Sequence, residues 1–134
     1  MSRVVVDCSM TCCWLLDEES NTSADTLLQQ VVIFGAYAPS IWWVETRIVS
    51  IASERRRRIT PVETNESLSL LVELGIHLDS QPVEGTLLTL ARRHGLTVYD
   101  ALNLELAYRQ RVPLAKLDRA FARAAGLEEV QLAN

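Results

Sequence analysis

The chain has 134 residues, 49% of them hydrophobic and 22% charged, and a formal net charge of −4 at pH 7. That size suits one domain, residues 1–134, with a sizeable core, and the mixed composition excludes a low-complexity or disordered chain. No apolar run approaches the roughly 20 residues that cross a membrane, and no signal-peptide pattern follows the N-terminal run. We therefore expect a cytoplasmic protein that does not bind a membrane.

Strand-like and helix-like segments alternate from the start of the chain. The run "RVVVD", residues 3–7, is short and rich in β-branched residues, which predicts a buried strand. Thr60-Pro61-Val62-Glu63 joins an N-cap residue, a proline at the first helical position and a capping-box acid, which predicts a new helix. The other expected strands lie within 37–40, 76–78, 112–118 and 128–132, and the expected helices cover 9–17, 22–34, 41–58, 61–75, 83–94, 98–111 and 119–125. Alternation of this kind predicts the α/β class, with a short, mostly parallel sheet wrapped by helices.

The three cysteines, Cys8, Cys12 and Cys13, crowd into one segment. An odd count within one helical stretch is not typical of a disulfide framework. Structural zinc sites combine spaced cysteine pairs with histidines, and both histidines, His77 and His94, lie far away in the sequence. We therefore expect buried thiols.

The basic residues are almost all arginine, because Lys116 is the single lysine among 13 basic residues. Arginine makes two-point contacts with phosphate groups, so clusters of it suit a nucleic-acid partner despite the negative net charge. Arg92, Arg93 and Arg119 belong to a segment, 84–126, that is poor in acids. They are candidates for contacts with an RNA backbone. The alternative is that they lie on solvated helix faces.

The helix expected over 41–58 opens with two adjacent tryptophans, Trp42 and Trp43. Neighbouring residues on a helix point about 100° apart. Because tryptophan is highly buried on average, we expect both to pack against neighbouring helices. The alternative, one exposed tryptophan, would suit an interface with a protein partner or a second copy.

Two acids close expected strands. Asp7 ends "RVVVD" and Asp118 ends the strand-like "PLAKL". Both would lie at the carboxyl edge of a parallel sheet, where sites form in such folds. Each also has a plainer explanation, because Asp7 or Ser9 could cap the next helix and Asp118 is a natural N-cap for 119–125.

Two further acids occupy helix positions that face inward in the apolar pattern. Glu45 is followed at i+3, i+4 and i+7 by apolar residues, namely Ile48, Val49 and Ala52. Asp100 opens the helix expected over 98–111, with apolar residues at i+4 and i+7. The alternatives are that Glu45 pairs with an arginine and that Thr97-x-x-Asp100 is only a capping box.

A divalent cation would explain all four acids together. Burying an unpaired carboxylate costs free energy. No histidine, cysteine or lysine recurs on the inward-facing apolar positions of the two helices that carry Glu45 and Asp100. Ligation by oxygen alone favours Mg²⁺ or Mn²⁺.

Three blocks of the sequence carry a family resemblance. They are "VVVDCSMTCCWLLDEE", "PSIWWVETRIVSIASERRRR" and "LARRHGLTVYDALNLELAYRQRVPLAKLDRAFARAAG". In this order they resemble the motif blocks of PIN-domain ribonucleases, and most closely those of the VapC toxins of bacterial toxin–antitoxin pairs. The spacing of "LTVYDALNLELA" and "PLAKLD" is the specific part of this resemblance.

The resemblance implies a three-layer α/β/α fold around a short parallel sheet. It implies an acidic pocket in which Asp7, Glu45, Asp100 and Asp118 are both catalytic residues and ligands of Mg²⁺ or Mn²⁺, with the Ser9 hydroxyl lining it. Proteins similar to this one cleave RNA to 5′-phosphate and 3′-hydroxyl ends. They are held inactive by a cognate antitoxin and commonly form homodimers.

Two positions in this pocket depart from the usual pattern of the family. Lys116 stands two residues before Asp118, where threonine or serine is usual, and its charge could bind the scissile phosphate or weaken the metal. Asn103 replaces an aromatic residue one turn after Asp100 and could ligate the metal through water. The sequence predicts a metal-dependent endoribonuclease toxin. The alternative is a catalytically weak PIN-like module that binds RNA or a protein without cutting.

Overall fold

The computed structural model describes residues 2–16, 22–115, 128 and 130. Within them, four parallel strands form one sheet in the order β3-β2-β1-β4. The strands are β1 (Val4–Val6), β2 (Ala36–Pro39), β3 (His77–Asp79) and β4 (Leu114–Ala115). The helices are α1 (Cys8–Leu15), α2 (Thr22–Phe34), α3 (Ile41–Arg55), α4 (Pro61–Glu73), α5 (Glu84–His94) and α6 (Val98–Gln110). The predicted α/β class with a short parallel sheet is confirmed.

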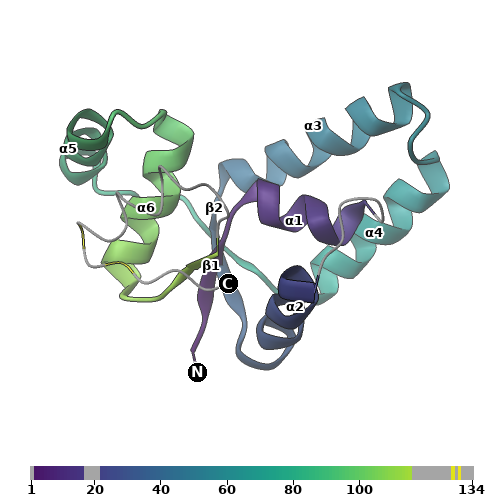
Figure 1. Cartoon of the computed structure of the whole chain (residues 1–134), viewed down its shortest axis with the longest axis horizontal. Helices are drawn as coiled ribbons and strands as arrows, with labels where there is room; N and C mark the ends of the chain where they lie inside the picture. The colour runs from purple at the N-terminus through teal and green to yellow at the C-terminus, as the bar shows by residue number, and fades with distance from the viewer. Residues whose placement is uncertain (1, 17–21, 116–127, 129, 131–134) are drawn as a thin grey trace.

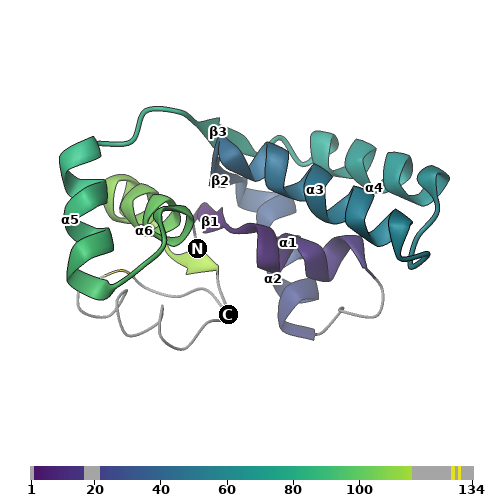
Figure 2. The same cartoon turned by 90° about the horizontal axis from the view of Figure 1, so that it is seen from above.

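The sheet lies between two layers of helices. Helices α1, α2, α3 and α4 lie on one side of it, and α5 and α6 lie on the other (Figures 1 and 2). Helix α6 packs directly on β1, β2 and β4. This is the three-layer α/β/α arrangement that the family resemblance implied. No helix in the described ranges has the length and apolar character needed to span a membrane.

The central strand β1 is buried on both of its faces. Val4 and Val6 pack into one hydrophobic core with residues of α1 to α4, whereas Val5 packs into a second core with residues of α5 and α6. All three valines are 0% exposed. Because successive side chains of a strand point to opposite faces, an unbroken valine run is stable only between two helical layers.

Helix ends follow the signals in the sequence. The Thr60 hydroxyl oxygen accepts from the Glu63 backbone N–H at 3.2 Å, and the Glu63 carboxylate accepts from the Thr60 N–H at 3.1 Å, which completes the predicted capping box. Gly95 ends α5 at φ 61°, a conformation that glycine adopts without strain. Of the strand expected over 128–132, Glu128 lies in a turn and Val130 has no regular structure. The helix expected over 119–125 falls outside the described residues.

The buried face of α3 differs from the one that the apolar pattern predicted. Its buried residues are Trp42, Thr46, Ser50 and Ser53. Ile48, expected on the buried stripe with Glu45, is 62% exposed, and Glu45 itself is half-buried at the border. The hydroxyls of Thr46 and Ser50 donate to carbonyls one turn earlier at 3.0 and 2.8 Å, so these small side chains can be buried where α3 packs on α1. Small residues allow this packing, and apolar periodicity alone pointed to the wrong face.

The two tryptophans of α3 have different environments. Trp42 is 4% exposed, whereas Trp43 is 51% exposed and carries the Arg47 guanidinium 4.2 Å above its ring. The expectation that both would be packed was therefore wrong. The roughly 100° between adjacent helical positions places only Trp42 against the core.

Candidate active site at the carboxyl edge of the sheet

Asp7 directly follows β1 at the carboxyl edge of the sheet and is 3% exposed. Its Oδ1 accepts from the Met10 backbone N–H at 2.9 Å, and its Oδ2 accepts from the Ser9 hydroxyl at 2.6 Å. Asp7 is therefore the N-cap of α1, as the plainer explanation expected. A carboxylate oxygen has more than one lone pair, so capping leaves acceptor capacity for a cation.

A short chain of hydrogen bonds fixes the start of α3 beside Asp7. The Thr11 hydroxyl donates to the Asp7 carbonyl at 2.9 Å, and Trp42 Nε1 donates to the same hydroxyl at 2.9 Å. Glu45 lies three residues after Trp42, on the adjoining face of α3. The buried tryptophan therefore sets where Glu45 lies relative to α1.

The surroundings of the Cys8 thiol indicate that Asp7 and Glu45 lie in the same region. Its pKa is raised, first by the hydrogen bond to Cys12 and by burial, and further by the negative charges of Glu45 and Asp7. Both carboxylates therefore lie within electrostatic range of one side chain. The structure thus brings Asp7 and Glu45 to the same region, between α1 and α3.

Asp100 belongs to the opposite helical layer, at the start of α6. It lies half-buried in the first turn of α6, where its backbone N–H donates to the Thr97 hydroxyl oxygen at 3.2 Å. Helix α6 leads through 111–113 into β4, which runs parallel to β1. The end of α6 is therefore at the amino edge of the sheet, and its start, with Asp100, lies toward the carboxyl edge.

Asn103 carries a buried oxygen one turn after Asp100. The residue is 6% exposed, and its Nδ2 donates to the Tyr99 carbonyl at 3.1 Å. Its Oδ1 receives no hydrogen bond from any residue that the structure describes. An unsatisfied buried acceptor costs about 1–3 kcal/mol, so a buried oxygen of this kind suits a cation or a cation-bound water.

Part of the expected site lies outside the described residues. That part comprises Asp118, Lys116 and Arg119. Within the ranges described, no three residues of the types Asp, Glu, His and Cys lie close enough together to hold a metal ion. The remaining donors are carboxylate and amide oxygens, which are the ligands that Mg²⁺ and Mn²⁺ prefer, so the residues fit the predicted cation in kind.

The candidate RNA-binding arginines of α5 occupy its last turn. Arg93 Nη1 donates to Glu128 Oε2 at 2.5 Å, and His94 Nε2 lies 2.7 Å from the same oxygen. Burial acts to raise the pKa of Glu128, but hydrogen bonds from His94 and Arg93 outweigh it, and the pKa is lowered. Arg92 and Arg93 are both exposed, and Arg93 is engaged by the Glu128 carboxylate.

The sequence reasoning missed a partly buried ion triad made by Asp79, Glu105 and Arg109. Arg109 donates to both Asp79 oxygens at 3.1 and 2.7 Å, and to Glu105 from Nε and Nη2, each at 2.9 Å. Glu105 Oε2 also accepts from the Val83 backbone N–H at 3.5 Å. The triad joins the end of β3 and the start of α5 to α6. Two signals pointed to it: Asp79 closes the expected strand "IHL", and Glu105 stands four residues before Arg109.

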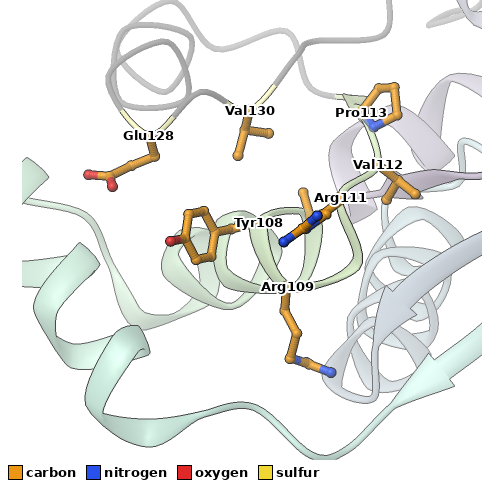
Figure 3. A pocket seen from close by; sticks show the side chains of 8 residues that line it. Tyr108, Arg109, Arg111, Val112, Pro113, Glu128 and Val130 are labelled. Carbon is orange, nitrogen blue, oxygen red and sulfur yellow. The ribbon is translucent and has the colours of Figure 1, made fainter.

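A hollow of about 580 Å³ lies at the other end of α6 from Asp100 (Figure 3). Tyr108 and Arg111 line it from the end of α6, and Glu128 and Val130 line it from the C-terminal part of the chain. None of Asp7, Glu45 and Asp100 is among its described walls. The hollow is therefore separate from the candidate active site.

Comparison with known proteins supports the fold and its family. A family model described as the PIN domain matches residues 4–127. The crystal structure of PAE2754 from Pyrobaculum aerophilum superposes with a TM-score of 0.70 at 17% identity, covering 92% of this chain and 86% of that one. FitAcB from Neisseria gonorrhoeae superposes with a TM-score of 0.69 at 18% identity, covering 98% and 96%. A search of curated proteins gave no match.

Proposed function

Because the chain belongs to the PIN domain family, whose members are generally nucleases that use a divalent metal, we propose that it is an Mg²⁺- or Mn²⁺-dependent endoribonuclease. We further propose that it is a toxin of the VapC type in a type II toxin–antitoxin pair and acts in the cytoplasm. In this proposal RNA is the substrate, a cognate antitoxin is the inhibitory partner, and a second copy of the chain completes a homodimer.

The observation that carries the metal part of the proposal is the buried oxygen of Asn103. It is 6% exposed, has no donor among the described residues, and lies one turn after Asp100. A protein interior rarely leaves such an oxygen unsatisfied. A cation or its water held beside Asp100 would satisfy it.

The acids would divide the work at this site. Asp7, Asp100 and Asp118 would hold the cation, and Glu45 would contribute directly or through water. The Ser9 hydroxyl, 2.6 Å from Asp7 Oδ2, keeps that carboxylate in place. When bound, the cation would supply Lewis acidity that makes a nearby water more acidic and offsets charge on the phosphate.

The basic residues would position the RNA backbone. Arg92 is exposed at the end of α5 and free of the constraint that Glu128 places on Arg93. Lys116 and Arg119 flank the proposed ligand Asp118 in the sequence. Contacts of this type are electrostatic, so RNA binding should weaken as the salt concentration rises.

The test is cleavage of a labelled RNA panel by the purified full chain with Mg²⁺, Mn²⁺ or EDTA. We expect cleavage with either metal and none with EDTA, and we expect Asp100→Asn to abolish it. Asp25→Asn is the matched control, because Asp25 also lies in the first turn of a helix but is exposed. Equal activity of the two variants, after removal of contaminating nuclease, would overturn the assignment of Asp100.

A second readout does not depend on turnover. Asn103→Leu should weaken Mn²⁺ binding by about tenfold, as measured by calorimetry, because outer ligands commonly contribute that much to metal affinity. The Leu side chain has the same number and branching of heavy atoms as Asn, and circular dichroism checks that the fold is unchanged. Unchanged Mn²⁺ affinity would remove Asn103 from the site.

The alternative function is a catalytically weak module that binds RNA or a protein without cutting. Its support is Lys116, a cation two residues before Asp118, and the lack of a compact three-residue ligand group in the described ranges. Tight RNA binding that is independent of metal, with no cleavage under any condition, would favour it. In that case Lys116→Thr is the first variant to test for restored cleavage.

A further inference from the structure

Two of the three cysteines face each other on α1. Cys8 and Cys12 are four residues apart, so they lie one above the other on the same side of the helix, and their Sγ atoms are 4.0 Å apart. Two sulfurs bound to one Zn²⁺ at about 2.3 Å in tetrahedral geometry are about 3.8 Å apart. The two thiols therefore already have nearly the spacing that one tetrahedral cation requires.

The surroundings of the pair favour a cation over an anion. Cys8 is the first residue of α1 and directly follows Asp7 at the carboxyl edge of the sheet. Cys8 is half-buried and reachable from solvent, and Cys12 is 8% exposed. Negative charge concentrated around a partly exposed site raises the local concentration of cations.

We infer that Cys8 and Cys12 form a binding site for a thiophilic divalent cation of the Zn²⁺ or Cd²⁺ class, beside the acids of the candidate active site. Ligands at i and i+4 on one helical face are an established way to chelate such a cation. Since no three-residue ligand group exists in the described ranges, water completes the coordination, and the affinity is weaker than that of a closed structural zinc site.

This site would matter for the proposed nuclease because of its position. Each thiol would lose its proton on binding, so the cation and its two thiolates would be neutral together and would not repel a second cation. A thiophilic cation at this position could instead draw Asp7 or Glu45 as a further ligand, and in that way Zn²⁺ would compete with Mg²⁺ or Mn²⁺ for the same acids. That consequence rests on the proposed function, whereas the binding site itself does not.

The test is a Cd²⁺ titration of the full, reduced, metal-free chain, followed through the ultraviolet absorption of cadmium–thiolate bonds. We expect one Cd²⁺ per chain, and a loss of affinity of about tenfold or more in Cys8→Ser and in Cys12→Ser. Cys13→Ser is the matched control and should bind as the parent does. Cys13 is also on α1 and buried, but its thiol donates to the Ser9 carbonyl at 3.7 Å.

The outcomes separate clearly. No thiolate band in the parent, or equal loss in Cys13→Ser, would overturn the inference, as would full retention in either Cys8→Ser or Cys12→Ser. Cys12→Ala provides a second variant if serine at that buried position prevents folding, and circular dichroism checks each fold. Asp100→Asn should still bind Cd²⁺. The Cd²⁺ titration therefore tests the cysteine site even if the nuclease proposal fails.

Discussion

The ion triad of Asp79, Glu105 and Arg109 predicts that one substitution, Arg109→Met, will strongly destabilise the fold. The side chains are 24% exposed at Arg109, 11% at Asp79 and 1% at Glu105, so water does little to screen them. Removing the guanidinium leaves two carboxylates facing each other without a counter-charge. Breaking a buried ion pair in this way costs about 3–5 kcal/mol of unfolding free energy.

That cost is large for a chain of this size. Typical domains have a total unfolding free energy of about 5–15 kcal/mol, and for this length the expected drop in melting temperature is roughly 10–15 °C. Urea unfolding followed by circular dichroism measures the free energy, and a thermal scan measures the midpoint. Arg92→Met is the matched control, because Arg92 is exposed on α5, and its effect should stay within about 0.5 kcal/mol.

A double variant tests the cause of the destabilisation. Glu105→Met combined with Arg109→Met removes the buried Glu105 carboxylate together with its counter-charge, so that only Asp79 is left without a partner from the triad. Replacing a buried ion pair by apolar side chains is often neutral or stabilising. We expect the double variant to be more stable than Arg109→Met alone. The reasoning fails if the unfolding free energy of Arg109→Met is within about 1 kcal/mol of that of the parent. It also fails if the double variant is less stable than Arg109→Met alone.

Three further predictions concern stability and the site. Asp7→Asn should keep the cap of α1 while losing RNA cleavage, whereas Asp7→Ala should lose cleavage and also about 0.5–2 kcal/mol of unfolding free energy, as urea unfolding will show. The pKa of Asp79 is lowered from its ordinary 3.8 by the hydrogen bonds of Arg109, so its ionised form stabilises the fold above that pH and the contribution is lost as the pH falls. Arg109→Met should therefore show a shallower decline of unfolding free energy between about pH 4 and pH 2 than the parent does; an equal slope would contradict this. Trp42→Phe removes the 2.9 Å hydrogen bond to Thr11 and should cost about 0.5–1.5 kcal/mol beyond the effect of Trp43→Phe at the exposed neighbour.

Local signals in the sequence were enough to predict most of the architecture. The three valines of β1, the capping box at Thr60 and Glu63, and the glycine stop at Gly95 each act over a few residues. The valines are buried on both faces of the sheet, the capping box satisfies backbone N–H groups that have no partner inside the helix, and the glycine adopts a left-handed backbone. None of these causes requires knowledge of distant contacts. Element types and order therefore followed from the sequence.

Features that depend on distant partners were not predictable in this way. The buried face of α3 depends on α1 accepting small residues such as Thr46, which an apolar pattern does not reveal. Asp79 closes a strand just as Asp7 does, but its partner Arg109 stands 30 residues later in the chain. Position at the end of a strand therefore does not by itself fix the role of an acid: Asp79 belongs to a structural ion triad, whereas Asp7 lies at the candidate active site.

Capping and catalysis are not competing explanations for Asp7. A strand that ends directly in a helix places one side chain where it can accept from the first turn, and the same geometry puts that carboxylate at the carboxyl edge of the sheet. Evidence of a cap thus says nothing against a metal site. What separates the two roles is chemistry that only one of them needs. Asn at position 7 keeps the acceptor oxygen for Met10 but loses the charge that a cation requires. Asn103 Oδ1, which has no donor among the residues that the structure describes, is not part of the cap of α1.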